Sequence, residues 1–155
     1  MTFGTQIEPA RFASTQWLFL RLLAIVYAIA FASLGVQVDG LIGSRGILPA
    51  GDFLNAVAQS LSGPTRYMAM PTVFWMNASD GMFRGVSIAG VALAVLLFLG
   101  FVERLALVLL FVLYLSLSNV GQDFLSFQWD ALLLEAGFLG IFLGRSQVVV
   151  WLYRW

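Results

Sequence analysis

The most constraining feature of this sequence is a series of apolar runs about as long as bilayer-spanning helices. The stretch 124–143, FLSFQWDALLLEAGFLGIFL, is one of them. A helix needs about 20 mostly apolar residues to cross the hydrocarbon core of a bilayer. Runs that meet or approach this length also lie at 15–36, 81–102 and 105–120. The sequence therefore predicts an all-α membrane protein with four transmembrane helices.

Composition supports a membrane location and excludes several classes of function. Hydrophobic residues make up 61% of the 155 residues and charged residues 10%, against about 45–50% and about 25% in soluble proteins. Eight cationic and eight acidic residues give a net charge of zero, which argues against nucleic acid as a partner. Cys, His and Lys are absent, so disulfides, thiolate or imidazole chemistry, typical zinc sites and Schiff bases are excluded. We expect no metal and no cofactor.

The connection between the first two predicted spans, 37–80, has a different character. Residues 37–51, QVDGLIGSRGILPAG, are rich in glycine and charge, and they predict a loop. Residues 52–61, DFLNAVAQSL, carry their apolar side chains on one helical stripe. This pattern predicts a short amphipathic helix on the membrane interface or over the bundle. A second short helix is predicted at 71–77, with proline at its first position.

The predicted spans belong to one membrane domain covering 1–155. Four spans place both ends of the chain on one side, and the distribution of arginine favours the cytoplasm for that side. The tail 145–155, RSQVVVWLYRW, is either an interfacial segment or the start of a truncated fifth span.

Four polar residues inside the predicted spans form a candidate buried polar cluster: Arg21, Gln128, Asp130 and Glu135. A charge at the centre of a spanning helix costs about 2.5–3.5 kcal/mol and usually faces a partner instead of lipid. Arg21 and Glu135 lie at similar predicted depths on antiparallel helices, about 5 Å apart along the membrane normal. We therefore expect an ion pair between them and a structural role for Glu135. For Asp130 the sequence allows two roles: packing within the bundle, or facing a cavity.

Three stretches resemble the amino-terminal membrane region of the lipase maturation factor family. They are AFASLGVQVDGLIGSRGILPA (30–50), YMAMPTVFWMNASD (67–80) and LYLSLSNVGQDFLSFQWDALLLEAGFLGIFL (113–143). This family is also distantly similar to the membrane part of the vitamin K-dependent γ-carboxylase. The resemblance implies a protein that helps dimeric secreted lipases reach an active fold. It also implies the endoplasmic-reticulum membrane for a eukaryotic source. The lack of lysine and the compact loops suit the inner membrane for a bacterial one.

The resemblance also carries a set of motif residues. Its loop motif consists of Gln37, Asp39, Gly40, Gly43, Gly46, Pro49, Asp80 and Gln122. Further matching positions are Pro71, Gly121, Gln128, Trp129, Asp130 and Glu135. Family members continue past WLYRW, 151–155, into a second half expected to meet the lipase. The chain is thus expected to be a fragment or a short stand-alone relative. Its expected partners are the lipid bilayer, a client lipase and the missing carboxy-terminal half.

The sequence leads to three hypotheses about function. The first is a non-enzymatic, chaperone-like scaffold in the maturation of lipases or other exported clients. The second is a small membrane oxidoreductase or carboxylase-like enzyme that uses Asp130 and Glu135 with a lipid-soluble quinone. The lack of His, Lys and Cys weighs against it, because such chemistry usually needs a tuned base or a metal. The third is a truncated gene product with no independent activity.

Overall fold

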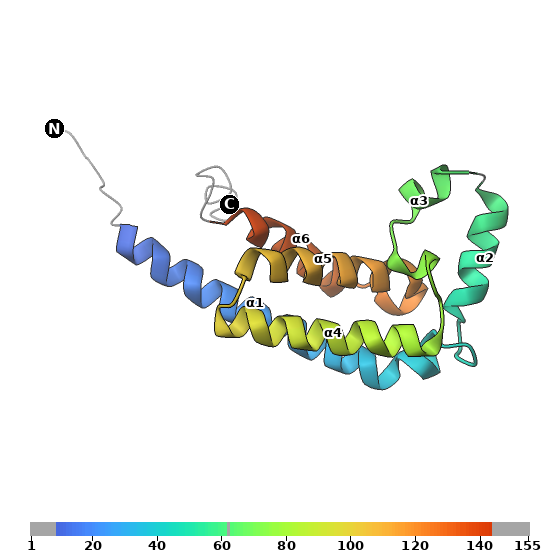
Figure 1. Ribbon diagram of the computed structural model, residues 1–155, viewed down its shortest axis with the longest axis horizontal. Helices are drawn as coiled ribbons and strands as arrows, with labels where there is room; N and C mark the ends of the chain where they lie inside the picture. Colours follow the sequence, from blue (N-terminus) through green and yellow to red (C-terminus); the bar gives the residue numbers. More distant parts are fainter. Residues whose placement is uncertain (1–8, 62, 144–155) are drawn as a thin grey trace.

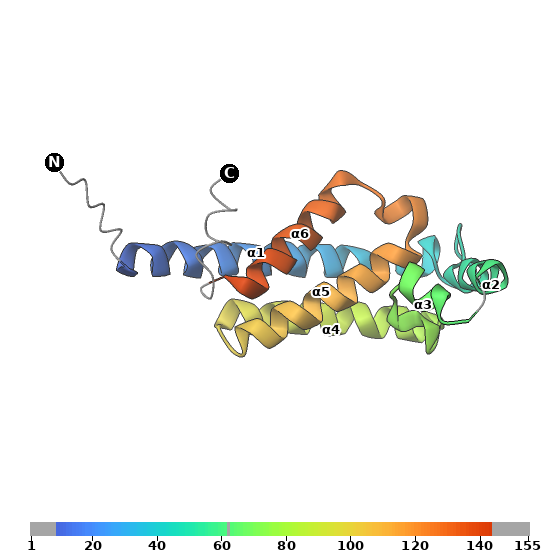
Figure 2. The ribbon, with the colours of Figure 1, turned by 90° about the horizontal axis from the view of Figure 1, so that it is seen from above.

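The computed structural model describes residues 9–61 and 63–143, and this part of the chain is helical, without strands (Figure 1). Three of its helices are long and apolar enough to cross a membrane: α1 (Pro9–Leu41, apolar from Ser14), α4 (Asp80–Leu99) and α5 (Glu103–Val120). Helix α4 runs back along α1, and α5 packs against α4 (Figures 1 and 2). The all-α membrane fold predicted from the apolar runs is confirmed.

The prediction of four spans is wrong for the described residues, which contain three helices of spanning length. The apolar run 124–143 is not one continuous helix. It begins in the 3₁₀ turn η2 (Gln122–Leu125), and α6 (Gln128–Phe142) starts only after Phe127, which has an extended ψ of 154°. The 15 residues of α6 extend over about 22 Å at 1.5 Å per residue, which is less than the roughly 30 Å of the hydrocarbon core. The tail 145–155 lies outside the described residues.

Helix α1 continues five residues beyond the predicted span and takes in the first part of the predicted loop. It ends at Leu41 instead of near residue 36. Val38, inside this extension, is 1% exposed and packs in the core. Burial of such a side chain is worth about 1.5–3 kcal/mol. That exceeds the roughly 1 kcal/mol by which Gly40 disfavours the helix, so the helix persists.

The connection to α4 crosses one end of the bundle (Figure 1). Helix α2 (Ala50–Ser60) confirms the amphipathic helix predicted at 52–61, and it buries Ala50 and Leu54. Helix α3 (Thr65–Ala69) was not expected from the sequence. The helix predicted at 71–77 is reduced to the 3₁₀ turn η1 (Val73–Trp75), which starts after Thr72 and buries Phe74.

An aromatic cluster holds the centre of the bundle. The rings of Phe31 and Tyr114 meet edge to face with centroids 5.4 Å apart, and those of Tyr27 and Tyr114 do so at 6.0 Å. Two glycines make room for it. A Cβ at Gly90 would collide with the Phe31 ring, and one at Gly137 with the Tyr27 hydroxyl. The glycines of α4 and α6 thus let these helices approach α1 closely, as small residues do in membrane bundles.

Candidate functional site

The end of α1 is tied to the beginning of α4 by an ion pair. The Nε of Arg84 donates to Oδ2 of Asp39 at 2.7 Å, and its Nη2 donates to the same oxygen. The two side chains remain 60% and 41% exposed. Exposed pairs contribute little to stability, so this contact mainly fixes how the two helix ends sit relative to each other.

A second carboxylate, Asp80 in the first turn of α4, holds the loop that follows α1. Its Oδ1 accepts from the backbone N–H of Ser44 at 2.7 Å, and its Oδ2 accepts from the Ser44 hydroxyl at 2.8 Å. The preceding residue, Ser79, caps α4 by accepting from the N–H of Met82. A negative charge in the first helical turn also suits the helix dipole. Asp80 therefore connects loop, cap and helix at one point.

The loop between α1 and α2 folds back on the end of α1. The N–H groups of Ile47 and Leu48 donate to the carbonyls of Gly40 and Leu41 at 3.0 and 2.9 Å. These bonds satisfy carbonyl groups that a helix end leaves without partners. The turn is too tight for a side chain at Gly43, where a Cβ would lie 2.5 Å from the carbonyl oxygen of Asp39. Glycine at this position is a steric requirement.

The segment after α5 contacts the same loop. Gln122 adopts a left-handed backbone with φ of 50°, and its side-chain amide donates to the carbonyl of Leu48 at 3.4 Å. One turn earlier, Asn119 donates to the carbonyl of Pro71 at 2.8 Å. These bonds join the end of α5 to both halves of the connection.

Most of the loop motif is therefore brought together at one end of the bundle. Members that take part in these contacts are Asp39, Gly43, Gly46, Asp80 and Gln122, with Pro49 preceding α2 as its cap. Gln37 and Gly40 lie in the last turns of α1 instead of in a loop, and both are exposed. The amide of Gln37 donates to the hydroxyl of Ser33 at 3.1 Å.

The predicted buried polar cluster does not form. Gln128 and Glu135 are exposed on α6. Arg21, which was expected to pair with Glu135, instead donates through Nη1 to Oε1 of Glu103 at 3.0 Å and to the carbonyl of Leu97 at 2.7 Å. The physical reason is that α4, not α6, is the main neighbour of α1. The α4–α5 turn therefore reaches Arg21, at the opposite end of the bundle from the loop motif.

Asp130 has a different environment from the other three. Its Oδ1 accepts from the Tyr114 hydroxyl at 2.5 Å, a bond between α6 and α5. It also lines a cavity of about 420 Å³ that is bounded by α1, α5, η2 and α6. The sequence left two roles open for Asp130, packing and facing a cavity. In the structure it both bonds to Tyr114 and lines a cavity.

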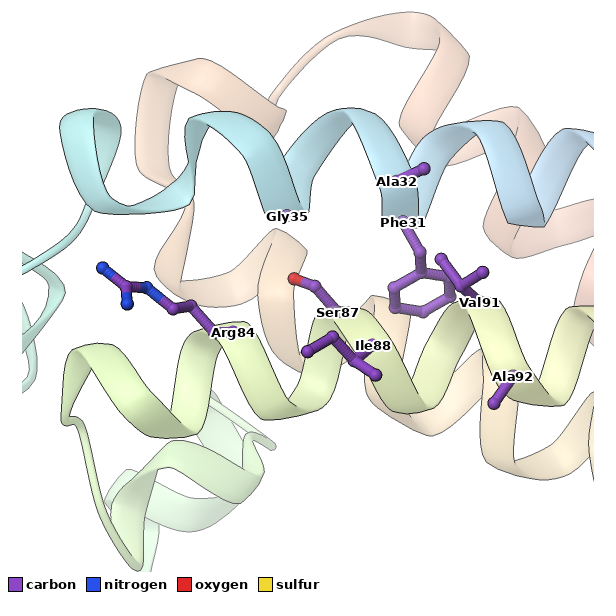
Figure 3. Close-up of a pocket in the computed structure, with 8 residues that line it drawn as sticks. All are labelled: Phe31, Ala32, Gly35, Arg84, Ser87, Ile88, Val91 and Ala92. Atoms are coloured by element: carbon purple, nitrogen blue, oxygen red, sulfur yellow. The ribbon is translucent and has the colours of Figure 1, made fainter.

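A second cavity, of about 460 Å³, lies between α1 and α4 (Figure 3). Phe31 projects from α1 toward α4, and the Ser87 hydroxyl lies near Gly35. The only charged residue among those lining this cavity is Arg84. The remaining lining is small or apolar, so this cavity lacks the grouped acid, base and nucleophile that a reaction site needs.

Several contact residues of these sites were missed from the sequence. Ser44, Arg84, Glu103 and Tyr114 were not among the predicted site residues. The sequence did contain a signal for one of these contacts, the ion pair between Asp39 and Arg84. Asp39 and Arg84 lie near the adjoining ends of consecutive antiparallel helices, so matching their depths would have paired them.

Comparison with known proteins places the chain in a family. Residues 14–155 match the family described as "Lipase maturation factor transmembrane domain". The chain is 38% identical to lipase maturation factor 1 of Mus musculus over 96% of its own length, and 36% identical to that of Homo sapiens over 96%. Lipase maturation factor 2 of Gallus gallus is 37% identical over 96%. No solved structure matches.

The matched region is a limited part of these relatives. The chain spans about 30% of the two factor 1 proteins and 23% of the factor 2 protein. The match and the three apolar helices of spanning length together establish an integral membrane protein. The chain belongs to the lipase maturation factor family.

Proposed function

We propose that the chain is a non-enzymatic, chaperone-like membrane scaffold in the maturation of lipases or other exported clients. One observation supports this most strongly. The charged residues of the loop motif bond to other elements of the bundle: Asp39 to Arg84, and Asp80 to Ser44. They hold a connection of defined shape over one end of the membrane helices, as a surface that presents or receives another protein requires.

The proposed partners are the bilayer, a lipase client and the additional sequence that the longer relatives contain. The proposed location is the endoplasmic-reticulum membrane for a eukaryotic source and the inner membrane for a bacterial one. The relatives named above are eukaryotic, and a secreted lipase meets its maturation machinery in the membrane where export begins.

The quinone-dependent enzyme is not favoured. It needs Asp130 and Glu135 to act at one site, but Asp130 lines the cavity beside Tyr114 whereas Glu135 is exposed and is not among the lining residues. The two acids therefore do not face one substrate.

The test is a panel of variants co-expressed with a secreted lipase. The panel contains Gly43→Val in the loop, Gly137→Ala in the bundle and Asp130→Asn in the cavity. For each, the amount of folded protein and the activity per molecule of secreted lipase are measured. For a scaffold, we expect lipase activity to fall in proportion to the amount of folded protein. The ratio of the two should be the same in all variants.

The control is Gly85→Ala, at a position where a Cβ meets open space. It should give the same amount of folded protein and the same lipase activity as the wild type. An Asp130→Asn variant that remains fully folded but abolishes lipase activation, as expected for an enzyme, contradicts the proposal. So does a lipase whose activity is the same with and without the chain.

A further inference from the structure

The cavity beside Asp130 opens toward the lipid. Val26 and Ile29 of α1 line it, and they are 49% and 64% exposed. Large apolar side chains exposed in the middle of a spanning helix face acyl chains in a membrane protein. A molecule can therefore enter this cavity sideways from the bilayer.

The size of the cavity decides what kind of molecule it can hold. Its volume is about 420 Å³, within the range of about 300–1,000 Å³ of small-molecule sites. A further helix, with a diameter of about 10–12 Å and a length of some 30 Å, needs several times that volume. The cavity accommodates one flexible chain or a small amphiphile.

The charge of the cavity selects the polar end of that molecule. Asp130 is the only charged residue among those lining it. Its Oδ1 is occupied by the Tyr114 hydroxyl, while no hydrogen bond to its Oδ2 is found within 9–61 and 63–143. The lining residue Gln37 uses its amide nitrogen on Ser33 and keeps its amide oxygen as an acceptor. The cavity thus offers acceptors and a negative charge, and it calls for a ligand with cationic N–H donors.

The cavity extends from the middle of the bundle to its loop-motif end. Its lining residues on α1 run from Val26 to Leu41, the last residue of that helix. Trp129, which also lines the cavity, is 76% exposed, and tryptophan is enriched at the boundary between hydrocarbon and headgroups, so a lipid headgroup can reach Asp130 from this end. Apolar side chains such as Ala30, Leu34 and Leu133 line the rest of the cavity.

We propose that this cavity binds a phospholipid with a primary ammonium headgroup, of the phosphatidylethanolamine type. The ammonium group donates to Oδ2 of Asp130 and to the Gln37 amide oxygen, and an acyl chain lies along the apolar lining. The Tyr114 hydroxyl holds the carboxylate in place. This site requires only the membrane fold, and it stands or fails independently of a role in lipase maturation.

The experiment measures lipids retained by the purified chain in native mass spectrometry. The probes are phosphatidylethanolamine, its N-methyl and N,N-dimethyl forms, phosphatidylcholine and phosphatidylglycerol, all with the same acyl chains. Successive methylation removes N–H donors without removing the charge. We expect about tenfold stronger retention of phosphatidylethanolamine than of phosphatidylcholine, the size of one charge-assisted hydrogen bond, with the methylated forms between them.

Variants assign the preference to the cavity. Asp130→Asn keeps an acceptor for the Tyr114 hydroxyl but removes the charge, and it should reduce phosphatidylethanolamine retention to that of phosphatidylcholine. Ala30→Leu keeps the carboxylate but fills the cavity, and it should lower retention of all five lipids. The matched controls Asp123→Asn and Glu135→Gln remove exposed carboxylates that do not line the cavity, and they should keep the wild-type preference.

Three results would overturn the proposal. The first is a wild-type chain that retains all five lipids equally or prefers phosphatidylglycerol. The second is a headgroup preference that survives in folded Asp130→Asn. The third is a preference lost equally in Glu135→Gln, which would reflect the overall charge of the chain. The methylation series uses the wild-type protein, so it decides the matter even if a variant does not fold.

Discussion

Arg21 is the one buried charged side chain among the residues described, at 9% exposure. It is stable inside a membrane bundle because its guanidinium bonds to both Leu97 and Glu103, across the turn between α4 and α5. Gly100 makes this possible. Its φ of 87° ends α4, and a Cβ there would lie 2.7 Å from Nη2 of Arg21.

At the residue scale, Arg21→Leu should destabilise the bundle by about 1–3 kcal/mol, because it leaves the Glu103 carboxylate without its charged donor and the Leu97 carbonyl with the Gly100 N–H alone. Unfolding by a denaturing detergent measures this change. The control is Glu135→Gln, an exposed position that should stay within about 0.5 kcal/mol of wild type. Equal damage from both variants would restore the Arg21–Glu135 pair expected from sequence.

The loop after α1 provides a second prediction at this scale. Asp80→Ala removes both acceptors of Ser44, so the Ser44 amide should exchange its hydrogen several-fold faster. Hydrogen exchange followed by mass spectrometry measures this rate. Asp123→Ala removes an exposed carboxylate from the same end of the bundle without a bond to Ser44, and it should leave the rate unchanged. Unaltered exchange in Asp80→Ala would mean that the backbone bonds alone hold the loop.

At the element scale, the position of α6 depends on one close approach. The Tyr27 hydroxyl donates to the Leu133 carbonyl at 3.2 Å and occupies the space beside Gly137. Helix α6 has only 15 residues, so losing this contact should affect it more than it would affect a longer helix.

Gly137→Ala should therefore destabilise the protein by about 1–3 kcal/mol, the usual effect of overpacking. Tyr27→Phe removes the colliding oxygen, so the double variant should be more stable than the sum of the two single changes by at least about 0.5 kcal/mol. Detergent unfolding of all three variants gives this coupling. Additive effects would show that α6 does not rest on Tyr27. Gly85→Ala, in open space, serves as the control.

Some helices could be predicted from the sequence, and other features of the fold could not. Hydrophobic length identified α1, α4 and α5, and apolar periodicity identified α2, because these depend on local composition. The break before α6 escaped detection because residues 124–127 are as apolar as the helix that follows. The extension of α1 through Gly40 depends on burial of Val38, which no local pattern specifies.

The candidate sites divide in the same way. The resemblance gave Asp39, Asp80 and Gln122 as members of one loop motif, but their partners Arg84, Ser44 and the Leu48 carbonyl follow from how the helices pack. The Arg21–Glu135 hypothesis used depth alone. Depth restricts the possible partners of a buried charge, and the choice of neighbouring helix then decides among them.

At the scale of the whole molecule, the loop-motif end and the Arg21 end of the bundle are expected to lie on opposite sides of a bilayer. The absence of cysteine from the sequence makes this directly measurable. Single cysteines can be placed at Ser60 and Asp123, both exposed at the loop-motif end, and at Phe101 in the α4–α5 turn, which is 61% exposed.

The decisive measurement is labelling of these three variants with a membrane-impermeant maleimide, in sealed vesicles and after permeabilisation. Because α4 and α5 are each long and apolar enough to cross the membrane, cysteines at 60 and 123 should react from one side and a cysteine at 101 from the other. In sealed vesicles the maleimide should label only the cysteines on the outer side, and after permeabilisation it should label all three variants. Equal labelling of all three from one side of sealed vesicles would contradict the transmembrane bundle.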